Sequence, residues 1–106
     1  MKLRIRESGF NEYDPFINTV NQNVIAELNK IKKYIPSLEF DFQILGDGYI
    51  EAKAINTDTM DSTAYVIDLY RNQLCVSCQS VSSVKKFDDL DSFREWMKED
   101  IEDELF

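Results

Sequence analysis

Apolar and polar residues alternate most regularly between Leu38 and Ile44, where every second residue is apolar and those between are polar. A period of two is typical of a strand with one buried and one exposed face. Weaker alternation predicts three more strands, at 49–55, 63–70 and 74–80. Turns are expected between these strands, at 46–48, 56–62 and 71–73.

Two further stretches extend this pattern of strands. Residues 2–7 alternate charged and apolar side chains, which predicts a short edge strand with Leu3 and Ile5 toward the core. Residues 80–87 carry enough β-branched and aromatic residues to prolong the strand at 74–80. The sheet should therefore hold four to five strands, mostly antiparallel because short links join consecutive strands.

Helical periodicity appears between Asp14 and Pro36. Asp14 is a plausible N-cap, Pro15 fits the first helical position, and Pro36 should end the helix. The apolar residues that share one narrow stripe of this helix are Ile17, Val20, Val24, Leu28, Ile31 and Ile35.

A second helix is expected over residues 88–106, with Asp88 or Asp89 as its cap. Its apolar stripe consists of Leu90, Phe93, Met97 and Ile101. The predicted order is β-α-β-β-β-β-α, which is an α+β fold in one domain spanning residues 1–106, with the two helices packed on the sheet.

The formal net charge of −8 is concentrated in one segment. Residues 88–106 carry nine acidic and two basic side chains, a net of −7, while residues 1–53 sum to −1 and residues 54–87 to zero. Phosphates repel such a surface, so direct binding of nucleic acid is not expected. No stretch resembles a membrane span or a signal peptide, so the expected location is the cytoplasm.

The residue types needed for common catalytic or metal sites are scarce. The chain has no histidine, which removes the most frequent general base and metal ligand. Cys75 and Cys78 have the C-x-x-C spacing, but they fall within a predicted strand, where they would point to opposite faces. The pattern favours Cys78 in the core and Cys75 partly covered, and redox or metal chemistry is the alternative.

Two other short motifs also favour ordinary turns. Asn56–Ser62 begins like a calcium loop, but Asp61 stands where the loop glycine belongs and Ile67 where the last glutamate belongs. Gly46–Gly48 lacks the following helix of a phosphate loop. We therefore expect no catalytic residue, no cofactor and no bound metal, and the chain is not expected to be an enzyme.

The polar face of the second helix is the candidate partner-binding surface. It comprises Glu95, Glu99, Glu102 and Asp103, with Asp100 and Trp96 beside them. Carboxylates repeat at i, i+4 and crowd the C-terminal end, where the helix dipole disfavours anions. Local choices that oppose stability are often functional.

Two alternatives to partner binding remain open for this face, and two roles for Trp96 beside it. It can be a solvated surface that keeps the protein soluble, or it can pair internally with basic residues at 30–33 or in the strand 2–7. Trp96, at the edge of the apolar stripe, can close the core or anchor a partner.

In size and charge, the chain resembles the small inhibitors that phages and mobile elements make, such as anti-restriction and anti-CRISPR proteins, and equally toxin-immunity proteins. No motif carries this resemblance and it assigns no role to any residue. It implies a non-enzymatic protein whose acidic helix engages a basic partner, a nuclease, another nucleic-acid-binding protein or a toxin, as a nucleic-acid mimic. The alternatives are a module that homodimerises through a strand edge or sheet face, and a redox protein using its two cysteines.

Overall fold

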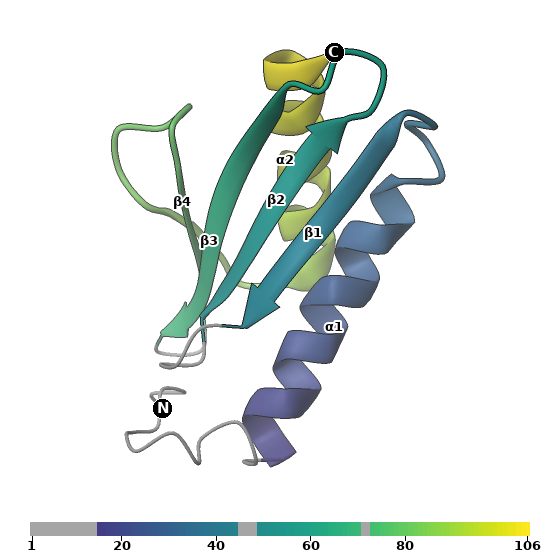
Figure 1. Cartoon of the computed structure of the whole chain (residues 1–106). Coiled ribbons are helices and arrows are strands. Elements are labelled where there is room, and N and C mark those ends of the chain that lie inside the picture. Colours follow the sequence, from purple (N-terminus) through teal and green to yellow (C-terminus); the bar gives the residue numbers. More distant parts are fainter. Residues whose placement is uncertain (1–14, 45–48, 71–72) are drawn as a thin grey trace.

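The computed structural model describes residues 15–44, 49–70 and 73–106, and for residues 15–21 the helical backbone alone. The elements in chain order are α1 (Pro15–Ile31), β1 (Leu38–Ile44), β2 (Ile50–Asn56), β3 (Ser62–Tyr70), β4 (Gln73–Cys78), β5 (Lys85–Phe87) and α2 (Leu90–Leu105). The five strands form one antiparallel sheet in the order β1-β2-β3-β4-β5. The predicted α+β class, with an antiparallel sheet and two helices, is confirmed (Figure 1).

The strand register decides which residues meet the helices. One row across the sheet pairs Phe42 with Ala52, Ala52 with Tyr65, and Tyr65 with Cys78. This row and its neighbours two residues away face the same side, because side chains alternate along each strand. All buried strand residues lie on this face, and every described residue of the opposite face is at least partly exposed.

Both helices contribute to a single core over that face (Figure 1). The fully buried helical side chains are Val24, Leu28 and Ile31 of α1 and Phe93, Met97 and Ile101 of α2. They continue the apolar stripes expected from the sequence and pack against the inward side chains of the strands. The result is a two-layer structure in which the described part of the chain leaves the outer face of the sheet uncovered.

Two small residues bring the layers close together. Ala52 and Ala54 of β2 are completely buried beneath the helices. Their partners in β1 are Phe42 and Phe40, whose rings stack with centroids 5.4 Å apart. Large and small side chains thus alternate across neighbouring strands, as a close-packed core requires.

The first helix is shorter than the sequence predicted. Its α-helical hydrogen bonds end at Ile31, and the next three amides bond to carbonyls three residues back, with Tyr34 N donating to Ile31 O at 2.9 Å. This tighter turn ends the helix before Pro36, yet it still buries Ile35 at 6% exposure. The expected stripe therefore continues past the helix end.

The expectation that residues 80–87 prolong the last strand is wrong. The chain turns at Gln79–Ser80, with Val81 N donating to Cys78 O, and returns as β5 antiparallel to β4. Ser80 is drawn toward α2, because its hydroxyl donates a hydrogen bond to Asp100 Oδ1 at 2.6 Å. This long-range bond competes with continued pairing along β3.

Some predictions fall outside the described residues. They are the edge strand at 2–7, the N-cap Asp14, the turn at 46–48 and most of the turn at 71–73. The side chains of Ile17 and Val20, which begin the predicted stripe of α1, are likewise not described.

Asn56 joins the turn between β2 and β3 to the end of α2. Its Oδ1 accepts hydrogen bonds from the amides of Asp58, at 2.9 Å, and Thr59. Its Nδ2 donates to the Leu105 carbonyl at 2.8 Å. Asn56 is 5% exposed, so its side chain satisfies an otherwise open carbonyl at a helix C-terminus.

The same turn contains an unfavourable backbone conformation. Met60 has a φ of 65°, in the left-handed region where glycine or asparagine is preferred. For a residue with a Cβ atom this conformation costs roughly 1–2 kcal/mol. A hydrogen bond from Met60 N to Asn56 O, at 2.6 Å, holds the residue there.

Asn56 provides the first test of this architecture. Asn56→Ala should lower the free energy of unfolding by about 2 kcal/mol, since it leaves buried amide and carbonyl groups without partners. Asn56→Asp keeps the oxygen that accepts hydrogen bonds from the turn and removes the NH₂ group that donates to Leu105. If Asn56→Asp loses as much free energy of unfolding as Asn56→Ala, the contact with the end of α2 accounts for the effect. Urea denaturation measures both, with the exposed-turn variant Thr59→Ala, expected within about 0.5 kcal/mol of wild type, as control. Equal losses in all three variants would contradict this role.

Candidate functional site

Helix α2 begins at one of the two caps that the sequence allowed. Asp89 is the N-cap, and its Oδ1 accepts a hydrogen bond from Ser92 N at 2.7 Å. This hydrogen bond lowers the pKa of the Asp89 carboxyl below its ordinary value. The first turn is thereby fixed, and with it the direction in which each later side chain of α2 points.

Four faces of α2 have different surroundings. Phe93, Met97 and Ile101 point into the core. One flank faces α1, the other faces β4 and β5, and the fourth face points to solvent. The candidate residues from the sequence are distributed over both flanks and the solvent face, so they do not form one uniform surface.

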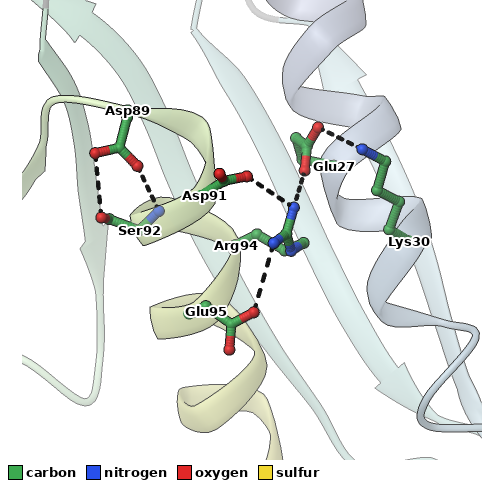
Figure 2. Close-up of polar contacts among 7 residues, drawn as sticks. All are labelled: Glu27, Lys30, Asp89, Asp91, Ser92, Arg94 and Glu95. Atoms are coloured by element: carbon green, nitrogen blue, oxygen red, sulfur yellow. Dashed lines mark hydrogen bonds and ion pairs between the residues drawn. The ribbon is translucent and has the colours of Figure 1, made fainter.

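Arg94 forms the contact with α1 (Figure 2). Its Nη1 donates to Glu27 Oε1 of α1 at 2.7 Å and to Asp91 Oδ1 at 3.2 Å, and its Nη2 lies 3.5 Å from Glu95 Oε2. Glu27 also accepts a hydrogen bond from Lys30 at 2.9 Å. Two cations and three carboxylates therefore join the two helices.

The polarity of this contact is the reverse of the internal pairing considered from the sequence. The acid lies on α1 and the base on α2, and Lys30 pairs with Glu27 of its own helix rather than with α2. Lys32 pairs with Glu39 at 3.0 Å, again away from α2. The basic residues at the end of α1 therefore do not neutralise the acidic face.

The network shifts the protonation of its members. The hydrogen bond from Lys30 lowers the pKa of Glu27, and Arg94 lowers it further against an opposing effect of burial. The hydrogen bond to Glu27 raises the pKa of Arg94. Glu27 has a side chain only 12% exposed, so its charge is stabilised chiefly by these two partners.

Lys98 is the second cation of α2, and it neutralises one candidate residue. Its Nζ lies 3.3 Å from Glu102 Oε2, one turn along the helix. The same ammonium group lies 5.9 Å from the centre of the Tyr34 ring, near the end of α1. Glu102 is therefore part of the flank facing α1 and has a partner within the chain.

Asp100 is directed at the sheet. Its Oδ2 accepts a hydrogen bond from the Tyr65 hydroxyl and its Oδ1 one from Ser80, both at 2.6 Å. Burial, and then the bond to Asp100, raise the pKa of Tyr65 well above its ordinary value. Both oxygens of Asp100 are thus engaged internally, and its role in the structure is to hold α2 on β3 and the β4–β5 connection.

A sequence signal for this contact exists in retrospect. Asp100 lies about 80° from Leu90 around the helix, on the border of the apolar stripe rather than opposite it. A carboxylate at that position meets the neighbouring layer and needs a partner there. The identity of the partner, Tyr65, requires knowledge of the strand register.

Trp96 closes the core on the β5 side. Its ring lies 5.7 Å from that of Phe87, and Phe87 contacts Phe93 edge-on at 6.0 Å. Trp96 is partly buried against the core cluster. Of the two roles weighed from the sequence, this packing is the one the structure displays.

The solvent-facing row consists of Glu95, Glu99 and Asp103. Glu95 is 67% exposed and has its contact with Arg94 at 3.5 Å. Glu99 and Asp103 are exposed and make no hydrogen bond or ion pair with any residue that the structure describes. The row is therefore an acidic ridge, with spacing of about 6 Å set by one residue per turn.

The two cysteines are arranged as the strand pattern predicted. Cys78 packs beside the core and lies 3.2 Å from the Ser80 hydroxyl, while Cys75 is on the outer face, paired across the strands with Asp68 and Lys86. Three residues of strand separate their Cα atoms by about 10 Å. A disulfide needs less than about 7 Å, so the pair cannot close in this strand.

Two hollows on the described surface do not pair a hydroxyl or thiol group with an acid or base. One of about 380 Å³ on the outer sheet face is lined by Asp41, Gln43, Glu51, Lys53 and Ala64. One of about 150 Å³ at the β4–β5 connection is lined by Ser77, Cys78, Val81, Ser82, Ser83 and Val84. The first lacks a hydroxyl or thiol group and the second lacks an acid or base.

Within residues 15–44, 49–70 and 73–106, no three Cys, Asp or Glu side chains are grouped as metal ligands. In the same ranges, neither helix has the length and apolar character needed to cross a bilayer.

The Arg94 network predicts a pH dependence of stability. The folded-state pKa of Glu27 is below its unfolded value, so its stabilising contribution is complete above pH ~4.3 and is lost as pH falls through the lower folded value. Glu27→Gln should therefore have a lower free energy of unfolding than wild type at pH 7. Between about pH 4.3 and pH 3, its free energy of unfolding should fall less than that of the wild type. Denaturation between pH 7 and 3 measures this, with Glu39→Gln, from the exposed pair with Lys32, as control. Parallel curves for wild type and Glu27→Gln would contradict the role of the network.

The chain was compared with known protein families, proteins and structures. Neither the protein-family models, nor the curated proteins, nor the solved structures provide a match.

Proposed function

We propose that the chain is a small non-enzymatic binding protein of the cytoplasm, which uses the solvent face of α2 to engage a basic partner protein. The observation that carries this proposal is the division of charge on α2. The two cations of the helix are engaged, Arg94 by Glu27, Asp91 and Glu95 and Lys98 by Glu102. Glu99 and Asp103 on the solvent face have no partner in the described structure. An unneutralised carboxylate row costs stability and attracts a surface of opposite charge.

The partner we propose is a protein that itself handles nucleic acid, or a toxin. The ridge spaces its carboxylates by about 6 Å on a rigid helix. Alternate phosphates of one DNA strand are separated by roughly 6.8 Å along the axis. A basic groove built for phosphates can therefore accept the ridge in their place, which makes inhibition by mimicry the specific form of the proposal.

Asp100, Glu102 and Trp96 have a different part in this proposal from the one expected of them as direct contacts. Asp100 and Trp96 are tied to the sheet, so they orient the helix that bears the ridge, and Glu102 is neutralised by Lys98 of the same helix. The direct contacts are assigned to Glu95, Glu99 and Asp103.

Charge reversal tests the ridge. Glu95→Lys, Glu99→Lys and Asp103→Lys together should reduce capture of the partner from host-cell lysate and slow its association about 10-fold or more. A tagged pull-down at low and high salt, with captured proteins identified by mass spectrometry, provides the first measurement. Wild-type capture should weaken with salt, because the charges are exposed.

A matched variant controls for net charge. Glu39→Lys, Asp41→Lys and Glu51→Lys change the charge by the same amount on the outer face of the sheet. This variant should retain the partner. Equal loss in both triple variants, or equal retention, would remove α2 from the binding role.

A second candidate function is homodimerisation through the sheet. In the described ranges, β1 pairs with β2 on one side and has no strand on the other, and the outer sheet face is uncovered. Unpaired edges can join between copies. Sedimentation velocity over a hundredfold range of concentration tests it: a salt-insensitive dimer would support this function, and a monomer throughout would exclude it.

A further inference from the structure

An apolar hollow of about 150 Å³ lies where α1, the sheet and the start of α2 meet. Its apolar lining comes from β3, β4, β5 and α2, and consists of Leu69, Leu74, Phe87 and Leu90. Leu74 is buried, whereas the other three are only partly buried although they pack against the core. The core is therefore incompletely covered at this point.

The polar residues that border the hollow do not themselves call for a ligand. Asp88 Oδ1 accepts a hydrogen bond from Gln73 Nε2 at 2.9 Å, and Asp89 is the N-cap of α2. The third polar residue, Asn23 of α1, is a neutral amide. Both carboxylates thus have partners within the chain, and the feature of the hollow that favours an occupant is its apolar lining.

The volume of the hollow matches one aromatic ring. A cavity of about 150 Å³ lined by leucine, isoleucine and phenylalanine side chains accommodates benzene. A phenyl ring placed here would lie beside the Phe87 ring, an arrangement that aromatic side chains favour, and would shield Leu69 and Leu90 from water. A phenylalanine side chain is therefore the occupant that fits.

The chain that precedes α1 contains such a ring within reach. Helix α1 begins at the end of the molecule where β3 ends, the lower end in Figure 1. Asn23, beside the hollow, lies eight residues after Pro15, about 12 Å along the helix axis. Residues 1–14 are outside the described residues, and Phe10 stands five residues before Pro15. Five extended residues span up to about 17 Å, whereas the two residues from Tyr13 to Pro15 span only about 7 Å. Phe10 is thus the nearest preceding aromatic residue whose backbone can reach the hollow.

We infer that the hollow is the docking site of Phe10 of the same chain, and that the segment before α1 folds back along that helix to place the ring there. The covalent link favours this occupant over a ring from another molecule, because a short linker gives it an effective concentration in the millimolar range. The docked ring connects α1, the sheet and the start of α2. Residues 1–14 then belong to the domain and are not a free arm, and this inference does not depend on the acidic ridge.

Nuclear Overhauser effects test the contact directly in the wild-type protein. The ring protons of Phe10 should show cross-peaks to the methyl groups of Leu69, Leu74 and Leu90. A sample that mixes isotopically labelled and unlabelled chains should show no such cross-peaks between molecules. Absence of the intramolecular cross-peaks, or their appearance between molecules, would overturn the inference.

Removal of the ring should create a binding site for benzene. Phe10→Ala should lower the Tm by about 10 °C and regain about 3 °C or more in buffer saturated with benzene, because benzene binds the hollow of the folded form alone. The Tm of the wild type should change by less than about 1 °C, since Phe10 already occupies the hollow. Tyr13→Ala removes an aromatic ring from the same segment, and as the control it should respond to benzene as the wild type does.

The outcomes separate an occupied hollow from a vacant one. A rise in the Tm of the wild type with benzene, accompanied by shifts of the Leu69 and Leu74 methyl resonances, would show that the hollow is vacant and refute the inference. A benzene response of Tyr13→Ala and none of Phe10→Ala would assign the site to the other ring and refute it as well. Should Phe10→Ala fail to fold, the cross-peaks and the response of the wild type to benzene decide alone. No partner protein takes part in these measurements, so their failure would leave the proposed role of the ridge intact.

Discussion

An acidic helix can pack on a sheet only if the charges on its inward and lateral faces have partners, and this requirement organises the structure. Burying an unpaired carboxylate is far more costly than leaving it in water. Asp100 accordingly takes hydrogen bonds from Tyr65 and Ser80, and Arg94 reaches Glu27 of α1. These contacts fix the rotation of α2 about its axis, and the rotation determines which carboxylates remain in solvent.

The division between internal and external charge follows from that rotation. A helix turned by one residue, about 100°, would bring Glu99 or Asp103 against the sheet and move Met97 outward. The buried Phe93, Met97 and Ile101 exclude this alternative. The acidic ridge is therefore a consequence of core packing as much as of composition, and it is rigid for the same reason.

Local patterns predicted the parts of the structure that depend on local physics. The alternation from Leu38 to Ile44 identified β1, the apolar stripe identified the buried face of α2, and the acidic residues just before that stripe, Asp88 or Asp89, identified its cap. The early end of α1 and the reversal after Cys78 were not predicted. The reversal involves a tertiary contact between Ser80 and Asp100, which are 20 residues apart. The end of α1 is instead a local turn of hydrogen bonds to carbonyls three residues back, which the apolar period does not distinguish from a continued helix.

The candidate site shows the same limit. Helical angles placed Glu95, Glu99 and Asp103 on the solvent face, because those angles depend on one helix alone. They did not reveal that Asp100 is occupied, since Tyr65 becomes its partner through the strand register, whereas the pair of Lys98 and Glu102 is an i, i+4 contact within one helix. The pattern of apolar residues did not indicate the conformation of Met60 for another reason. Its unusual feature is a positive φ angle, and no residue type in the turn predicts that a methionine adopts it.

The remaining exposed features oppose the stability of the isolated chain in two different ways. The ridge repels itself along α2, an effect that salt weakens, whereas Met60 combines backbone strain with exposed apolar area, which salt does not relieve. Solubility accounts for the ridge but gives no reason for an exposed methionine in a strained turn.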